Sequence, residues 1–400
     1  MPRRTIASQG ALEMTFRHRS AVFALAVMLV ASVVSAVALA APPQGAQTTE
    51  ARRADHVSGA PGAPGAVGDP SIVDIIGWGL QGLLGPEPDG GGTTIEMGAD
   101  GRLTILLIGS DYRPGYKYPI EHTDVIMVMS LDPNSRTIAA ASIPRDVVAF
   151  PRAPSNGGGT SGSSRVNNMY HEYTNKAGYA FEVQAMERFV DDVSYALALE
   201  IDHYAYIRFT GFDAMIDQIN GINVRIPNSI NDPIFKDEPT YPYGIYFPSS
   251  ASWPLKGANV KHCFSNSSSQ PCNRAIVYVR SRKGSVGGGA NSDERRARRQ
   301  QELIVKVIKK VTGQSDDFIQ ALAAAADNGN AEWGIKTDLS FGAALELRDM
   351  LTGAKFANGA RAVFVPTRFA TTCCNLPAYS SRLKLGAVRG WIDTYMPAVP

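Results

Sequence analysis

The chain has 400 residues, of which 44% are hydrophobic, and a formal net charge of +2. This length is enough for one large domain or two ordinary ones with a substantial core. The near balance of charges argues against nucleic acid as a bulk electrostatic partner. The four cysteines form no CxxC motif, so the sequence gives little support to a zinc or thioredoxin-like site.

The N-terminal region has the pattern of a membrane segment. Residues 1–20 carry several arginines, and the uncharged run 21–41 that follows is interrupted only by two serines. A helix over this run would be about 31 Å long, which is enough to span a bilayer core. The basic flank favours a cytoplasmic N-terminus, and a cleaved signal peptide ending near Ala38-Leu39-Ala40 is the alternative. Both interpretations place the rest of the chain outside the cytoplasm.

The segment 42–98 is rich in Ala, Pro and Gly, which predicts a flexible linker with a short apolar island at 72–84. From 99 to 366 strand and helix patterns alternate, which predicts a three-layer α/β/α domain with a mixed central sheet. Residues 367–400 are a C-terminal extension. The predicted strands are 103–109, 124–131, 137–143, 204–209, 222–226 and 362–365, and the predicted helices are 179–199, 212–219, 292–311 and 340–351.

The first three predicted strands bring charged side chains to one edge of the sheet if they form an antiparallel meander. The first strand precedes Asp111 and Arg113, the second begins with Asp124, and the third precedes Arg145 and Asp146. Carboxylates such as Asp111 and Asp124 suit a hard divalent cation such as Mg2+. Arginines beside such an ion form bidentate contacts with phosphate. The residues at this edge of the sheet therefore indicate phosphoryl chemistry rather than acyl transfer.

A second basic cluster follows later in the chain. The segment 278–282 (YVRSR) alternates in the manner of a strand, which puts its two arginines on one face. Asp293 lies in the first turn of the long predicted helix. Helical spacing puts Arg296, Arg299 and Gln300 on one side of that helix, whereas Arg298 points elsewhere. The residues that this cluster contributes to a predicted diphosphate site are Arg280, Arg282, Arg296, Arg299 and Gln300.

The domain also contains a series of short polar motifs. In order along the chain they are Gly109-Ser110-Asp111-Tyr112-Arg113, Thr123-Asp124, Ser142-Ile143-Pro144-Arg145-Asp146, Arg165-Val166-Asn167-Asn168-Met169-Tyr170, Tyr278-Val279-Arg280-Ser281-Arg282, 293–301 (DERRARRQQ) and Lys336-Thr337-Asp338-Leu339-Ser340. Together they resemble the LytR-CpsA-Psr family over roughly residues 100–366. The chain departs from that family at His122, where Arg is usual, and at Val125, where Thr is common.

This resemblance implies an enzyme that acts outside the cytoplasm, in agreement with the export predicted from residues 1–41. Such an enzyme transfers a phosphate-linked glycan from a polyprenyl-diphosphate carrier to peptidoglycan or another cell-envelope acceptor, with the help of Mg2+. Carried onto this chain, the resemblance implies that Asp111 and Asp124 hold the metal. It also implies that the diphosphate is surrounded by Arg145, Arg280, Arg282, Arg296, Arg299 and Gln300.

Several alternatives remain open at this point. A hydrolase that releases lipid phosphate with water, or a protein that binds polyprenyl phosphate without turnover, would use the same site. A transcription regulator is disfavoured by the exported topology and by the absence of a helix-turn-helix pattern. The sequence does not identify the general base, for which Asp111, Asp124 and Asp146 are all candidates. The apolar helix 179–199 either lines a groove for the lipid tail or packs in the core.

The cysteines lie outside the motifs of the resemblance. Cys263 and Cys272 are in an insertion relative to the family, and export to an oxidising compartment predicts that they close it as a disulfide. The alternative is that either of them pairs with Cys373 or Cys374, because four cysteines allow three connectivities.

Overall fold

The computed structural model describes residues 95–111, 121–174, 181–235, 244–257, 263, 271–312, 335–339, 341–366, 368–373 and 380–399. Within these ranges no helix is both long enough and apolar enough to cross a membrane. The predicted membrane segment 21–41, the apolar island 72–84 and Arg113 lie outside the described residues.

The first three strands form the antiparallel meander that the sequence predicts. β1 (Leu103–Ser110) pairs with β2 (Thr123–Asp132), which pairs with β3 (Thr137–Ser142). The turn between β2 and β3 is held by Asp132, whose carboxylate accepts a hydrogen bond of 2.8 Å from the backbone N–H of Asn134. All eight residues of β1 are buried, as expected of a strand covered on both faces.

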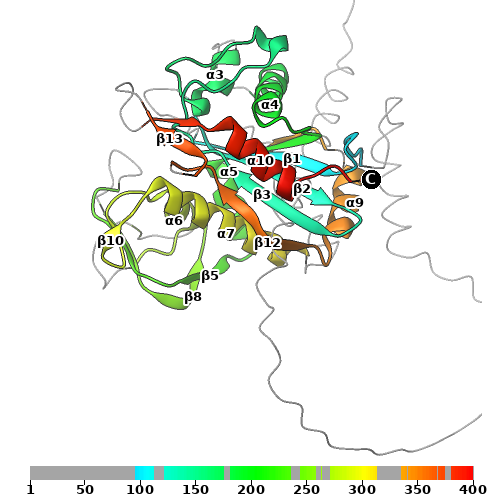
Figure 1. Cartoon of the computed structure of the whole chain (residues 1–400). Coiled ribbons are helices and arrows are strands. Elements are labelled where there is room, and N and C mark those ends of the chain that lie inside the picture. Colours follow the sequence, from blue (N-terminus) through cyan, green and yellow to red (C-terminus); the bar gives the residue numbers. More distant parts are fainter. Residues whose placement is uncertain are drawn as a thin grey trace, which may run out of the picture. The chain divides into compact units, whose positions relative to one another are not determined.

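Three further strands complete a six-stranded mixed sheet (Figure 1). β4 (His203–Arg208) runs parallel to β1, and β11 (Ile335–Thr337) runs antiparallel to β4. β12 (Lys355–Val363) runs parallel to β3. The order across the sheet is β11-β4-β1-β2-β3-β12. The predicted α/β class with a mixed sheet is confirmed.

The alternation of side chains along β4 shows that both faces of the sheet are covered. Tyr206 points to one face, where its ring lies 5.8 Å from the ring of Tyr170. Ala205 and Ile207 line a cavity on the other face. On the first face α4 (Val183–Leu197) contacts α3 (Met169–Tyr173) and α10 (Leu385–Tyr395), and on the second face α6 (Ala275–Arg280) contacts α5 (Phe209–Gln218) and α7 (Asp293–Thr312).

Shorter elements surround this framework. Two 3-10 turns, η2 and η3, precede α3, and α9 precedes β12. β5 pairs with β8, β13 pairs with β14, and β10-β9-β6-β7 form a small sheet of their own. Their bounds are η2 (Pro154–Asn156), η3 (Val166–Asn168), β5 (Ile222–Ile226), β6 (Ile230–Asp232), β7 (Ile245–Phe247), β8 (Ser250–Leu255), β9 (Ser285–Val286), β10 (Gly289–Ala290), α9 (Phe341–Leu351), β13 (Ala370–Thr372) and β14 (Ser381–Leu383).

The apolar side of α4 belongs to the hydrophobic core. Met186, Phe189 and Val193 are completely buried there, which is the usual fate of an amphipathic helix that packs on a sheet. No residue of α4 lines the cavity on the opposite face of the sheet. Of the two roles that the sequence leaves open for this helix, core packing is therefore the one that the structure supports.

The C-terminal extension and the insertion are both tied into the same domain. Val388, Trp391 and Ile392 of α10 are buried in the core, so the extension completes the packing of the domain. Cys263 and Cys272 form a disulfide, which confirms the predicted pairing and excludes the alternative connectivities. Closing such a loop stabilises the folded state by roughly 2–4 kcal/mol, chiefly through the entropy of the unfolded chain.

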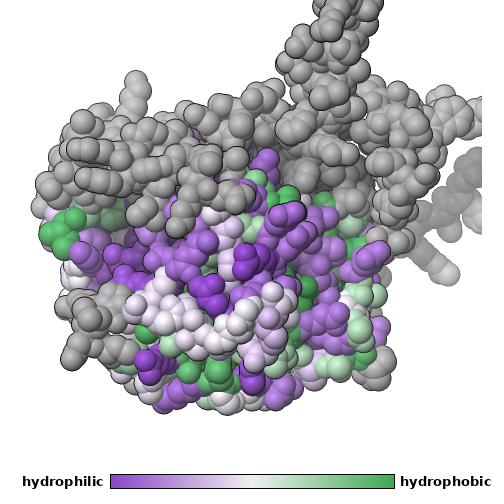
Figure 2. Space-filling view, turned by 90° about the horizontal axis from the view of Figure 1, so that it is seen from above, coloured by the Kyte–Doolittle hydropathy of each residue, from purple (hydrophilic) through white to green (hydrophobic). Residues whose placement is uncertain are grey.

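The surface contrasts with this interior. On the face seen in Figure 2, hydrophilic residues predominate and apolar residues form only small separate groups. Among the described residues, the large apolar side chains that are exposed are Met97, Val183, Tyr195 and Ile234. Ile234 is distinctive because it also lines the cavity described below.

Candidate active site

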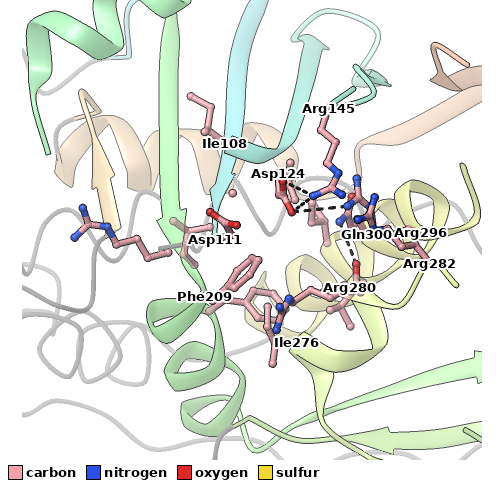
Figure 3. A pocket seen from close by; sticks show the side chains of 18 of the residues that line it. Ile108, Asp111, Asp124, Arg145, Phe209, Ile276, Arg280, Arg282, Arg296 and Gln300 are labelled. Atoms are coloured by element: carbon pink, nitrogen blue, oxygen red, sulfur yellow. Dashed lines mark hydrogen bonds and ion pairs between the residues drawn. The ribbon is translucent and has the colours of Figure 1, made fainter. Parts of the chain in front are cut away.

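Asp124, at the start of β2, is the centre of a charged cluster (Figure 3). Nη1 of Arg145 donates to both of its carboxylate oxygens, at 2.8 and 2.6 Å, and the amide of Asn167 donates to Oδ1 at 3.2 Å. Nη1 of Arg296 lies 3.9 Å from Oδ2. Burial opposes ionisation of this carboxyl, but the two arginines outweigh it and lower the pKa of Asp124 to about 2. Asp124 is therefore an anion at every physiological pH.

Asp111 follows β1 and lies beside the start of β2, as the meander predicts. Its Oδ1 accepts a hydrogen bond of 2.8 Å from the backbone N–H of His122, and its own N–H donates to the His122 carbonyl at 3.0 Å. Nδ1 of His122 lies 3.4 Å from Oδ2, and this interaction with Asp111 raises the pKa of the imidazole despite its partial burial. Because these contacts are made by the backbone and one imidazole, the carboxylate is less fully engaged than that of Asp124.

The first turn of α7 adds an acid that the sequence analysis did not assign to the site. Asp293 lies 3.3 Å from Arg296, 3.6 Å from Arg282 and 3.8 Å from Arg145, so it joins three arginines from separate segments. The hydroxyl of Ser292 accepts a hydrogen bond of 3.2 Å from the N–H of Arg295 and so caps the start of this helix. Asp293 therefore positions the arginines of the site.

The segment that carries Arg280 is a helix, and the predicted strand over 278–282 is wrong. Residues 275–280 form α6, because their apolar side chains pack between α5 and α7. Arg280 ends this helix, and its guanidinium lies over the rings of Phe209 and Phe235, at 4.8 and 5.5 Å. Arg282 lies in the loop that follows. Both arginines still line the same cavity, although by a different local geometry.

Arg299 and Gln300 lie one turn after Arg296 in α7, and their surroundings differ. Gln300 donates to the carbonyl of Val279 at 3.1 Å and lines the cavity. Arg299 is buried and does not line it. Its guanidinium donates to the carbonyls of Tyr278 (2.9 Å) and Ser281, and to Oδ1 of Asn291. Burial lowers the pKa of Arg299 to about 10. Arg299 therefore holds the loop that carries Arg282, and it is not among the described residues that line the cavity.

This arrangement predicts a difference between two neighbouring arginines. Arg299→Ala leaves buried carbonyls without a donor and should lower the free energy of unfolding by about 3 kcal/mol. Arg298 is exposed, and its one ion pair within the described residues is with Glu294, so Arg298→Ala should change the stability by less than about 0.5 kcal/mol. Urea denaturation of both variants measures this difference. Equal stability of the two variants would contradict the structural role of Arg299.

The charged cluster forms one end of a cavity of about 370 Å³. Six cationic and three acidic side chains are among the described residues of its lining; the cationic ones are Arg145, Arg208, Arg280, Arg282, Lys283 and Arg296. Apart from Gly109 and Gln300, the remainder of the lining is apolar and comes from β1, β2, β4, α5, α6, α7 and the turn after β6. It comprises Leu107, Ile108, Val125, Ala205, Ile207, Phe209, Phe212, Met215, Ile234, Phe235, Ile276, Val279, Leu303, Ile304 and Val307. The cavity thus combines a cationic end with an apolar channel.

A family model agrees with these features. The model of the LytR_cpsA_psr family matches residues 89–359 of the chain. The chain belongs to the LytR-CpsA-Psr family. The match includes every residue of the charged cluster, from Asp111 at the end of β1 to Gln300 in α7.

Curated relatives of this LytR-CpsA-Psr protein are distant. It is 26% identical over 262 residues to the cell wall biosynthesis protein LcpA of Corynebacterium glutamicum. The aligned part covers 59% of this chain and 46% of LcpA. The chain is 24% identical over 270 residues to the polyisoprenyl-teichoic acid–peptidoglycan teichoic acid transferase TagU of Halalkalibacterium halodurans. This alignment covers 68% of this chain and 72% of TagU. The chain spans less than half the length of LcpA and of Bacillus subtilis TagV, at 46% and 38%.

Solved structures share the fold. The crystal structure of Bacillus subtilis TagV has a TM-score of 0.52 and 20% sequence identity to this chain, and the match covers 76% of this chain and 100% of TagV. A Streptococcus agalactiae protein has a TM-score of 0.52 and 19% identity, with 75% and 89% covered. At this level of identity the comparison establishes the common α/β architecture.

Other polar residues near the site became visible only in the structure. Arg208 forms a buried ion pair with Glu121, with 3.1 Å between Nε and Oε1, and the hydroxyl of Ser110 donates to the same oxygen. Asn167 belongs to the family motif 165–170, so its presence near the site had a sequence signal. Glu121 and Arg208 had none, because they lie outside the motifs and meet only when β1 and β4 pair.

Proposed function

We propose that the chain is a phosphotransferase that moves a phosphate-linked glycan from a polyprenyl-diphosphate carrier to peptidoglycan or another cell-envelope acceptor. The observation that supports this most strongly is the cavity, in which an arginine-rich end continues into an apolar channel. A polyprenyl diphosphate has the same division into an anionic head and a long apolar tail. The names of the relatives TagU and TagV, which are polyisoprenyl-teichoic acid–peptidoglycan teichoic acid transferases, support the same substrates.

The transfer requires an attack at phosphorus. An acceptor hydroxyl forms a new P–O bond to the phosphorus that carries the glycan, and the bond from that phosphorus to the bridging oxygen breaks. The products are glycan-phosphate-acceptor and polyprenyl phosphate, and the hydroxyl proton is released. Arg145, Arg280 and Arg296 would stabilise the negative charge that shifts onto the leaving polyprenyl phosphate, which is the main contribution a protein makes to phosphoryl transfer.

We also infer a role for Mg2+, because the residues present suit this ion. Asp111 and Asp124 both line the cavity, and Mg2+ is commonly held by one or two carboxylates together with phosphate oxygens and water. The described residues contain no group of three or more metal-ligating side chains, which fits a site that substrate oxygens must complete. Asp111 is the less engaged carboxylate, whereas Arg145 occupies both oxygens of Asp124. When bound, the ion would neutralise charge on the phosphate oxygens.

We further propose that the domain lies outside the cytoplasm and that residues 21–41 anchor it in the cell membrane. The support is the apolar run with its basic flank, together with the Cys263–Cys272 disulfide, which is typical of oxidising compartments. Protease added to intact spheroplasts should digest the domain. Complete protection of the domain would contradict this location.

The function is tested with the full-length chain, a polyprenyl-diphosphate-linked disaccharide as donor and un-crosslinked peptidoglycan strands as acceptor. We expect release of polyprenyl phosphate together with label transfer to the glycan strand. Release of polyprenyl phosphate without label on the strand would identify a hydrolase, and donor binding without any release would identify a binding protein.

A further inference from the structure

A second cavity of about 300 Å³ adjoins the first. It lies over β2, β3 and β12 and the first turns of α7, whereas the first cavity lies over β1 and β4. Because β2 is between β1 and β3 in the sheet, the two cavities meet at the start of β2. The described residues that line both are Asp124, Val125, Arg296 and Gln300. A phosphorus atom held by these shared residues would be accessible from two sides.

The two cavities have opposite charge. In the first, six cationic side chains outnumber three acidic ones among the described lining residues. In the second, the acidic side chains are Asp124, Asp146, Asp293 and Glu294, and Arg296 is the one cation within the described lining. A diphosphate is therefore attracted to the first cavity and repelled from the second. The second favours a neutral ligand that can donate hydrogen bonds to carboxylates.

Two polar groups at the second cavity have hydrogen-bonding capacity left for such a ligand. The carboxylate of Asp146 is half-buried and accepts a hydrogen bond from its own backbone N–H, but no side chain of the described residues donates to it. Burial and the nearby Asp293 raise the pKa of this carboxyl. Arg296 is 4% exposed, and its Nε has no hydrogen-bond partner. Unsatisfied buried polar atoms such as this Nε are uncommon in folded proteins and often mark a ligand position. Both groups line the second cavity.

We propose that the second cavity is the acceptor subsite, where hydroxyl groups of a neutral sugar chain donate hydrogen bonds to Asp146. This inference rests on the proposed transferase function and deepens it. Ala297, Val365 and Pro366 supply an apolar wall for the C–H face of a sugar ring. With the donor in the first cavity and the acceptor in the second, the attacking hydroxyl and the leaving phosphate lie on opposite sides of the phosphorus, as in-line displacement requires.

The test is the acceptor dependence of transfer by the full-length chain, with un-crosslinked peptidoglycan strands as the probe. Asp146→Asn removes a charged hydrogen-bond acceptor and should raise the acceptor KM at least about tenfold. Ala297→Leu fills part of the second cavity and should raise the same KM. If this variant does not fold, the acceptor KM of Asp146→Asn alone tests whether the second cavity binds the acceptor. The donor Kd should change by less than about threefold in both variants, because neither residue lines the first cavity.

Asp191→Asn is the matched control, since this exposed aspartate of α4 contacts only the hydroxyl of Ser155 among the described residues. Its acceptor KM should equal that of the wild type. Unchanged acceptor KM in Asp146→Asn, with normal transfer by the wild type, would overturn the acceptor subsite and leave the transferase function standing. Absence of transfer by the wild type itself would overturn both.

Discussion

Replacing Asp124 by alanine is expected to lower turnover of the polyprenyl-diphosphate donor by about 1,000-fold, which corresponds to the several kcal/mol that a carboxylate-held Mg2+ contributes to phosphoryl transfer. The substitution removes a proposed metal ligand. It also removes the anion that orients Arg145 through two hydrogen bonds and lies 3.9 Å from Arg296. Turnover is measured as released polyprenyl phosphate over a range of Mg2+ concentrations, and folding is checked by circular dichroism.

Two further variants distinguish catalysis from binding. Arg280→Ala should weaken donor binding about tenfold by removing a charge-assisted contact, whereas Asp124→Ala should retain most donor affinity because Arg280 and Arg282 remain. Asp132→Ala changes the aspartate at the other end of β2, outside the cavity, and should leave turnover near the wild-type value. Wild-type turnover in both Asp124→Ala and Arg280→Ala would show that the proposed site is wrong.

The grouping of charged residues at one edge of the sheet was predictable because it depends on strands that are neighbours in the sequence. β1, β2 and β3 follow one another directly along the chain, so an antiparallel meander is their simplest arrangement. That arrangement alone brings Asp111, Asp124 and Arg145 together, and the structure confirms that all three line one cavity. Asp146 follows the same strand as Arg145 but faces the second cavity, since successive residues after a strand point in different directions.

The nature of the 275–280 segment was not predictable from its own residues. Ile, Val and Tyr favour strands, and the alternation of Arg280 and Arg282 has the period of a strand. Tertiary packing overrides this preference, because α6 buries Ile276, Val277 and Val279 against its neighbours. For so short a segment, periodicity cannot separate a buried helix from a strand.

The face of α7 was predicted only in part. Helical spacing groups Arg296, Arg299 and Gln300 on one side and excludes Arg298, and Arg298 is indeed exposed. Spacing could not show that Arg299 turns toward the carbonyls of Tyr278 and Ser281. That orientation depends on a loop whose path the sequence does not specify. For the same reason the apolar channel, which is built from segments far apart in the sequence, had no local signal.

The last prediction concerns this apolar channel. Ile207, Phe212 and Ile304 are only half-buried although they line the cavity, so apolar surface is left for a ligand to cover. Ile304→Gln places an amide there that a polyprenyl tail would desolvate without a hydrogen-bond partner. The Kd of a long-chain donor should therefore rise about 10- to 100-fold, from a cost of about 1–3 kcal/mol. Fluorescence titration with a labelled donor measures this change.

The control is the Kd of a donor that has the same head group and a tail of only two isoprene units. Its affinity should be almost unaffected by Ile304→Gln, since a short tail leaves most of the channel empty. Lys309→Gln introduces the same side chain at an exposed position of α7 that does not line the cavity, and it should bind both donors like the wild type. An equal loss of affinity for the long and the short donor in Ile304→Gln would mean that the channel does not hold the lipid tail.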